Sequence, residues 1–157
     1  MNKIYLGKYV NTHGIKGEIR IKSDFKYKNK AFLVGNTIYI NEKSFVITSY
    51  RVHKGYDMVI LDGIRDINDI EYLKGSLVFI DKDNINLNSD EYLDEDLLDC
   101  KVYVNNNLKG VVTGYEYLNK NKKILVIDKV KMIPFELIKN IDLKKKRIDI
   151  EGVDGLL

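Results

Sequence analysis

The strongest constraint on the fold is a two-residue alternation of apolar and polar side chains within short segments. In Glu18–Lys22 two isoleucines fall on one face of an extended chain and the charged side chains fall on the other. Further runs rich in strand-forming residues are bounded by polar turns, at 37–40, 45–48, 56–61, 77–80, 101–104, 110–117, 124–127 and 147–150. Short strands joined by short turns are typical of barrels and sandwiches, so we expect an all-β protein with one or two short helices.

One segment, Asp66–Gly75, departs from this alternation. Its apolar residues Ile67, Ile70 and Leu73 fall on one face of a helix. Its first residue can cap a helix, and its last, a glycine, can close the final turn in a left-handed conformation. We expect a short helix that plugs one end of a barrel.

An acidic stretch divides the chain. Residues 81–99 contain eight acidic residues and one lysine. Such a stretch repels itself and has little apolar surface to bury, which favours a linker. The expected organisation is an N-terminal β-barrel over residues 1–82, an acidic linker over 83–95 and a second small β-barrel over 96–157.

The net charge of +3 conceals an asymmetry between the halves of the chain. Residues 1–80 hold 13 basic and 8 acidic residues, a net of +5, whereas residues 81–157 hold 13 basic and 15 acidic residues, a net of −2. A basic front half favours an anionic partner such as RNA, although many lysine-rich faces are only solvated.

Membrane and secretory segments are not expected. The longest apolar runs have four residues, whereas a membrane span needs roughly 20 and the core of a signal peptide roughly 7–15. We therefore expect a cytoplasmic protein without membrane contact.

The lone cysteine and the two histidines limit metal and redox chemistry. Cys100 excludes an internal disulfide and a cysteine-based zinc site, and its hydrophobic neighbours favour a buried thiol. A metal site built on His13 and His53 would need scattered carboxylates as further ligands. We expect no metal and no cofactor.

The turn at Gly14–Gly17 raises the question of an enzyme. Its glycine spacing is wrong for a phosphate loop, and it precedes a strand rather than a helix. His13 as a general base would need an orienting carboxylate and a nucleophile, and Thr12 is a poor nucleophile. We therefore expect no enzyme, and the alternative of a flavin-binding reductase-like barrel lacks a phosphate nest and a flavin pocket in the sequence.

Two groups of residues favour binding instead. Arg20 and Lys22 project from one face of a strand, about 7 Å apart, and Lys8, His13 and Lys16 extend this basic patch. Basic groups can pair with phosphates, whereas the alternative is a solvated face.

A second candidate site lies in the acidic stretch. Tyr92 and Leu93 form an apolar pair flanked by five carboxylates, an arrangement that suits docking of a basic protein. Alternatively, Leu93 with Leu97 and Leu98 pins the linker to the second barrel. The sequence leaves both interpretations open.

Several of these stretches resemble one family. GKYVNTHGIKGEIRIKSDF, residues 7–25, resembles the N-terminal signature of the ribosome maturation factor RimM family, and RDINDIEYLKG resembles its short helix. DEYLDEDLLDCKVY, residues 90–103, resembles the junction into the C-terminal PRC-barrel of that family. MIPF, IDL and the terminal GLL resemble the end of that domain, so the resemblance extends in order along the whole chain.

The resemblance implies a translation-factor-like barrel followed by a PRC-barrel. It implies a monomeric, non-enzymatic assembly factor that binds small-subunit ribosomal protein nineteen and head-region 16S rRNA in the immature 30S subunit. Such a factor promotes late 30S maturation and 16S rRNA processing. A PRC-barrel scaffold for a non-ribosomal partner is the alternative.

The resemblance also implies contact residues. In the family the positions of Tyr92 and Leu93 are usually two aromatic residues in the ribosomal contact, and Leu93 keeps the apolar area without the stacking. The residues expected to contact ribosomal protein nineteen are Tyr92 and Leu93. The residues expected to contact RNA or the ribosome are Lys8, Asn11, His13, Lys16, Arg20 and Lys22.

Overall fold

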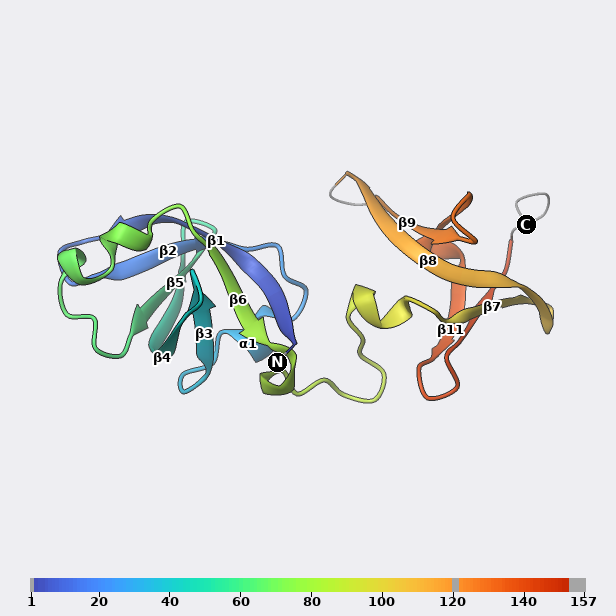
Figure 1. Cartoon of the computed structure of the whole chain (residues 1–157), viewed down its shortest axis with the longest axis horizontal. Helices are drawn as coiled ribbons and strands as arrows, with labels where there is room; N and C mark the ends of the chain where they lie inside the picture. Colours follow the sequence, from blue (N-terminus) through green and yellow to red (C-terminus); the bar gives the residue numbers. More distant parts are fainter. Residues whose placement is uncertain (1, 120–121, 153–157) are drawn as a thin grey trace. The chain divides into compact units, whose positions relative to one another are not determined.

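The computed structural model describes residues 2–119 and 122–152, and the chain forms two compact units, residues 1–88 and 89–157 (Figure 1). The division between the units falls inside the expected linker. Ile85 is buried in the core of the first unit, and Leu93 is buried within the second unit. The acidic segment is therefore not an exposed linker along its whole length, because the apolar side chains of Ile85 and Leu93 are buried.

The first unit is a closed barrel of six antiparallel strands in the order β1-β2-β5-β4-β3-β6 (Figure 1). The strands are β1 (Lys3–His13), β2 (Glu18–Lys22), β3 (Thr37–Ile40), β4 (Lys43–His53), β5 (Tyr56–Leu61) and β6 (Leu77–Asp81). A single turn of α-helix, α1 (Lys28–Ala31), and a 3₁₀ turn, η3 (Lys82–Asn84), complete the unit.

The alternation in the sequence becomes the inside and outside of this barrel. Ile19 and Ile21 on β2 are fully buried, as are Ile38 and Ile40 on β3. These side chains belong to one hydrophobic core inside the barrel. The polar residues between them consequently lie on the face opposite the core.

The expected helix at 66–75 is instead a pair of 3₁₀ turns, η1 (Ile67–Asp69) and η2 (Glu71–Leu73). The apolar residues recur at intervals of exactly three, which matches the three residues per turn of a 3₁₀ helix. Ile70 and Leu73 are buried in the barrel core, so the segment packs against the barrel as expected. The expected cap at Asp66 and the left-handed glycine that follows η2 are confirmed.

The second unit contains a six-stranded sheet in the order β10-β9-β8-β7-β12-β11. The strands are β7 (Lys101–Val104), β8 (Asn107–Asn119), β9 (Lys122–Ile127), β10 (Lys131–Pro134), β11 (Ile138–Asp142) and β12 (Arg147–Ile150). Only the pairing of β12 with β7 is parallel among the described strands. Two 3₁₀ turns, η4 (Asp94–Leu97) and η5 (Phe135–Leu137), belong to this unit.

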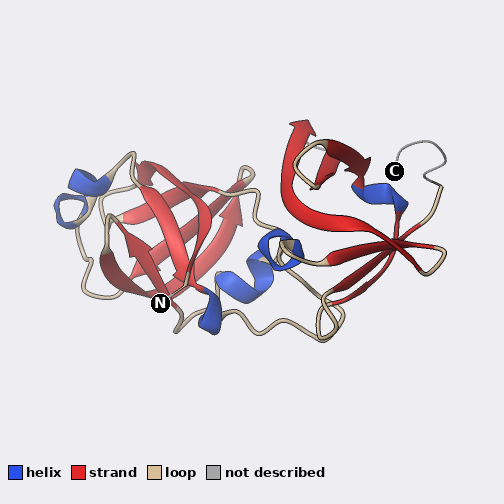
Figure 2. Ribbon diagram, turned by 45° about the vertical axis from the view of Figure 1, so that its right-hand side comes forward, coloured by secondary structure: helices blue, strands red, loops and turns tan. Residues whose placement is uncertain are grey.

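The all-β prediction is confirmed, and strands dominate both units in Figure 2. The second sheet differs from the barrel because, among the described strands, no pairing joins β10 to β11. Pro134 is the last residue of β10, opposite Ile124 of β9, and the chain then turns through η5 into β11. None of the helices in residues 2–119 and 122–152 is long and apolar enough to cross a membrane.

The core of the second unit includes the lone cysteine. Cys100 is fully buried beside Val102, Leu125 and Ile148, as the sequence predicts. Burial raises the pKa of its thiol, so the sulfur stays protonated. Residues 155–157, which carry part of the family resemblance, lie outside the described residues.

The turn between β1 and β2 gives a prediction for two glycines. Gly14 and Gly17 both have positive φ, but a Cβ on Gly17 would lie 2.7 Å from Ile64 Cγ2, whereas a Cβ on Gly14 would meet nothing within 4 Å. Gly14→Ala should lower the free energy of unfolding by about 1–2 kcal/mol through the left-handed backbone alone. Gly17→Ala should cost about 1–3 kcal/mol more because of the contact.

Urea unfolding followed by far-UV circular dichroism measures both variants. Equal losses of stability in the two variants would show that the loop around Ile64 yields without cost.

Candidate functional site

The predicted RNA contacts gather on one face of β1 and β2. Lys8 lies opposite Lys22, Asn11 opposite Arg20, and His13 opposite Glu18. Residues directly opposite each other in an antiparallel pair project to the same side, here the side away from the buried isoleucines. We call Lys8, Asn11, His13, Lys16, Arg20 and Lys22 the basic strand face.

A β-bulge in β1 determines which side chains of this strand lie on the basic strand face. Tyr9 pairs with Ile21 and Asn11 pairs with Arg20, so Val10 is an extra residue on β1. Strict alternation would turn Asn11 toward the core together with Tyr9. The bulge instead keeps Tyr9 buried and Asn11 exposed.

Members of the basic strand face differ in their surroundings. Lys8, Lys16 and Lys22 are exposed, with Lys16 in the turn between the strands. Arg20 is half-buried: its Nη2 lies 3.0 Å from His13 Nδ1, and its guanidinium lies 5.5 Å from the centre of the Tyr56 ring. The three lysines are therefore free to meet a partner, whereas Arg20 is held in place.

Residues from the hairpin of β4 and β5 join this site, and the sequence did not indicate them. His53 approaches His13 with 5.5 Å between ring centres, and Arg51 binds both carboxylate oxygens of Glu18 at 2.9 and 2.7 Å. We call His13, Glu18, Arg20, Arg51, His53 and Tyr56 the two-histidine cluster.

The cluster could not be predicted from the sequence, because it requires the strand order β1-β2-β5-β4, in which strands far apart in the sequence are neighbours in the sheet. One signal was present. Arg51 and His53 are two residues apart at the end of a strand, which places two potentially cationic side chains on the same face.

The electrostatics of the cluster follow from these contacts. Hydrogen bonds from Arg51 hold the pKa of Glu18 below its usual range. Burial lowers the pKa of His53, and the positive charges of Arg51 and Lys54 lower it further. The cluster thus combines a carboxylate already satisfied by one arginine with a histidine that resists taking on another positive charge.

The contacts within the cluster favour binding over catalysis. His13 Nδ1 is occupied by Arg20, and the Thr12 hydroxyl is hydrogen-bonded to Tyr9 rather than to His13. Within residues 2–119 and 122–152 no group of three or more histidine, cysteine, aspartate or glutamate residues is arranged to hold a metal ion. The arginine and histidine nitrogens instead form a surface rich in hydrogen-bond donors, which suits an anion.

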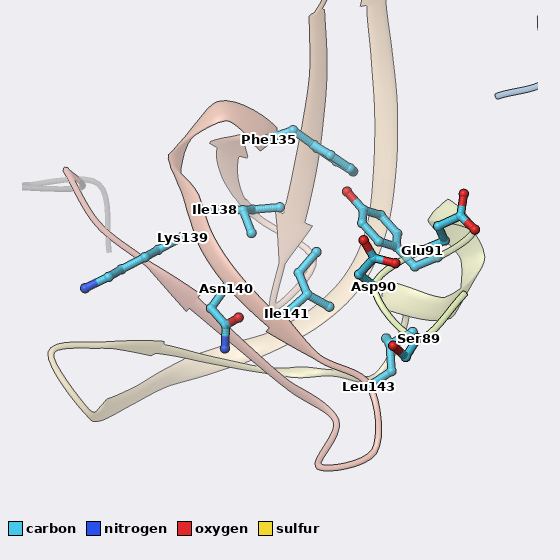
Figure 3. A pocket seen from close by; sticks show the side chains of 10 residues that line it. Ser89, Asp90, Glu91, Phe135, Ile138, Lys139, Asn140, Ile141 and Leu143 are labelled. Atoms are coloured by element: carbon cyan, nitrogen blue, oxygen red, sulfur yellow. The ribbon is translucent and has the colours of Figure 1, made fainter. Parts of the chain in front are cut away.

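A pocket of about 370 Å³ in the second unit is lined by Tyr92, one of the two residues of the other predicted site (Figure 3). Phe135, Ile138 and Ile141 supply apolar lining, and Asp90 and Glu91 supply carboxylates. Tyr92 is half-buried, lines the pocket and packs against the core of this unit. We call this region, including Ser89, Lys139, Asn140 and Leu143, the junction pocket.

The two residues of the predicted docking pair have different environments. Leu93 is 6% exposed and does not line the junction pocket. Its backbone N–H donates to Asp96, which anchors η4. The side chain of Leu93 is therefore buried, and Tyr92 is the member of the pair that lines the pocket.

The fold and these sites define a class of protein: a closed six-stranded barrel with a basic face, followed by a second β unit with an acidic and apolar pocket. Residues 4–85 match the family described as the RimM N-terminal domain, which is more than half of the chain. The chain belongs to the RimM family.

Similar proteins extend this match to both units. A protein of Staphylococcus saprophyticus named ribosome maturation factor RimM is 39% identical over 166 residues, covering 99% of each chain. A protein of the same name from Staphylococcus aureus is 33% identical over 165 residues, also with 99% of each chain covered.

Two solved structures are also similar. A RimM crystal structure from Pseudomonas aeruginosa has 19% identity and a TM-score of 0.46, and it covers 96% of this chain and 97% of its own. The N-terminal domain of RimM from Thermus thermophilus has 18% identity and a TM-score of 0.48, and it covers 55% of this chain and 98% of its own.

The ion pair between Glu18 and Arg51 predicts a pH dependence of stability. Because the pKa of Glu18 is lowered in the folded state, its stabilising contribution is complete above its unfolded pKa of about 4.3 and is lost as the pH falls through the folded pKa. Wild type should therefore exceed Glu18→Gln in free energy of unfolding at neutral pH, and the difference should shrink in acid.

Urea unfolding at a series of pH values from neutral to acid measures this difference. A difference that stays constant into the acid range would mean that the ion pair is not formed in solution.

Proposed function

We propose that this chain is a non-enzymatic ribosome maturation factor of the cytoplasm. It binds small-subunit ribosomal protein nineteen and head-region 16S rRNA, and it promotes late 30S maturation and 16S rRNA processing. The observation that carries the proposal is the similarity to proteins named ribosome maturation factor RimM, which are 39% and 33% identical over 99% of both chains. The surfaces of both units support it by their chemistry.

The basic strand face suits the RNA part of the proposal. Lys8 and Lys22 are exposed and directly opposite each other, and Lys16 extends the face into the turn. Lysine side chains are flexible, so their ammonium groups can pair with phosphates of an RNA whatever its base sequence. The closed barrel beneath supplies the firm support, because every one of its strands has two neighbours.

The junction pocket suits the protein part of the proposal. Its apolar lining offers area for a side chain of the partner, and Asp90 and Glu91 offer negative charge to a basic protein. Charge of this kind accelerates and orients association, whereas a few well-packed side chains supply most of the affinity. Tyr92 is the residue best placed to be such an anchor.

The proposed factor works by binding energy alone. It holds the ribosomal protein and the rRNA near their final geometry and leaves when mature contacts form. A factor can bias assembly in this way only if it binds the immature arrangement more tightly than the finished one.

Binding to free 30S subunits is the direct test of the proposal. The protein should co-sediment with free 30S subunits more than with 70S ribosomes, and a deletion strain should accumulate unprocessed 16S rRNA precursor. Equal sedimentation with both particles, together with normal processing in the deletion strain, would refute the proposal.

Removing lysines should alter the salt dependence of RNA binding. The triple variant Lys8→Gln, Lys16→Gln, Lys22→Gln should lower the log–log slope by roughly 0.7–0.9 for each phosphate that no longer pairs with an ammonium group. Fluorescence anisotropy with a 16S rRNA fragment measures it. The matched control is Lys131→Gln, Lys144→Gln, Lys145→Gln in the second unit, and equal slopes for both triple variants would place the RNA elsewhere.

Truncating Tyr92 should weaken the protein contact. Tyr92→Ala should reduce binding of ribosomal protein nineteen by about 1–3 kcal/mol, measured by calorimetry. The matched control, Tyr72→Ala, removes a tyrosine that is 63% exposed in the first unit and should leave binding unchanged.

Leu93 separates docking from packing. Leu93→Ala should lower the stability of the second unit by about 2–5 kcal/mol because the side chain of a buried leucine is removed. If Tyr92→Ala lowers stability in the same way and leaves affinity intact, Tyr92 too has only a packing role.

A further inference from the structure

The two-histidine cluster has a feature that a plain basic surface lacks. His13 and His53 are the only histidines of the chain, yet strands far apart in the sequence bring them together with 5.5 Å between ring centres. Arg20 from β2 and Arg51 from β4 lie on the same cluster. Four nitrogen-rich side chains from three strands therefore converge on one place.

The charges in the cluster are unevenly balanced. Both oxygens of Glu18 are taken by Arg51, so this carboxylate offsets one of the two arginines. Within the described part of the chain no carboxylate pairs with Arg20, and its Nε is buried without a hydrogen-bond partner. Arg20 keeps an uncompensated positive charge and an unused donor.

The hydrogen bond between Arg20 and His13 depends on protonation. A guanidinium only donates, so His13 Nδ1 must accept and carry no proton. If His13 becomes protonated, its Nδ1 turns into a donor and faces another donor. An anion that accepts a hydrogen bond from each of the two side chains, once they have separated, would remove this conflict.

We propose that the two-histidine cluster binds a phosphate group of RNA and that its histidines take up protons when this phosphate binds. This inference rests on the proposed function, which supplies the RNA, and it assigns the hairpin of β4 and β5 a part in holding it. Arg20 and Arg51 supply fixed positive charge, and His13 and His53 supply charge that appears when the phosphate arrives. Lysine ammonium groups of the basic strand face would engage neighbouring phosphates.

The electrostatic surroundings of His53 agree with proton uptake. The groups near it are His13 from β1, Glu18 and Arg20 from β2, Arg51 on its own strand, Lys54 in the turn and Tyr56 from β5. Most of these are cationic or can become so, and the positive charges help to lower the pKa of His53. A bound phosphate would offset that repulsion and favour the protonated ring.

The consequence is a pH-dependent affinity. An RNA phosphodiester keeps its single charge across the neutral range, so any change in affinity there comes from the protein. Binding should tighten as the pH falls from about 8 to about 6, because each proton that a histidine takes up on binding adds a favourable interaction with the phosphate. Lysine and arginine contacts alone would give a flat profile in this interval.

Imidazole NMR of the full chain without a histidine tag tests the inference directly, because only two rings contribute and each has one Hε1 signal. Each signal is titrated with pH alone, with a single-stranded oligouridylate and with inorganic phosphate. With the oligouridylate the proton affinity of both rings should rise about tenfold, a change of 1.36 kcal/mol. Unchanged titration curves with saturating RNA would overturn the inference.

The phosphate arm distinguishes the two sources of the anion. Shifts with the oligouridylate at concentrations where inorganic phosphate has no effect support an RNA site. Shifts with inorganic phosphate alone would overturn it in favour of a small-anion site.

Variants extend the test to affinity. Arg20→Gln and His53→Gln should each reduce the rise in RNA affinity between pH 8 and pH 6 to less than half. Lys43→Gln is the matched control: it removes a positive charge ten residues earlier on β4, about 30 Å along the strand, and should leave the pH profile intact. The wild-type NMR result decides the question if a variant fails to fold.

The outcome can be separated from that of the proposed function. Co-sedimentation with 30S subunits together with silent imidazoles would leave the proposed function standing and refute this inference. Responsive imidazoles without co-sedimentation would support an RNA site in a protein of another role.

Discussion

The structure depends first on the pairing of β1 with β6, which closes the barrel of the first unit. Closure gives every strand two neighbours, and the side chains of Ile19 and Ile21 on β2 and of Ile38 and Ile40 on β3 lie inside. Polar residues at alternate positions then have only the outer face available. The pairing of these two strands thus separates an apolar interior from an exterior that carries the charged side chains. Both proposed RNA-binding surfaces lie on that exterior.

Alternation allowed much of the fold to be predicted from sequence. Glu18–Lys22 contains a clear two-residue pattern, and its isoleucines are buried as expected. For the segment after Asp66 the expected short helix and its caps are present as two 3₁₀ turns, with Ile70 and Leu73 buried and Ile67 half-buried. Three apolar residues at intervals of three satisfy an α-helix and a 3₁₀ helix alike, and the segment is too short for a fourth to distinguish them.

The candidate sites show where reasoning from local sequence ends. Lysines on β1 and β2 could be grouped because their strands are adjacent in sequence and in space. Arg51 and His53 could not be grouped with them, because their contacts with β1 and β2 depend on β5 pairing with both β2 and β4. In the acidic segment, charge indicated exposure, yet Leu93 is buried and only Tyr92 reaches the pocket. Two adjacent residues can therefore have different environments, because consecutive side chains of an extended chain point in opposite directions.

The bulge at Val10 gives β1 one residue more than its pairing with β2 requires. Deletion of Val10 would make Asn11 the direct neighbour of Tyr9, and strict alternation would then keep Tyr9 inside and both Asn11 and His13 outside. Such a deletion would remove the extra bend and twist that a bulge gives a strand, but it would leave every later side chain of β1 on its present face. Relatives of this chain that are one residue shorter at this point could therefore keep the same outer face.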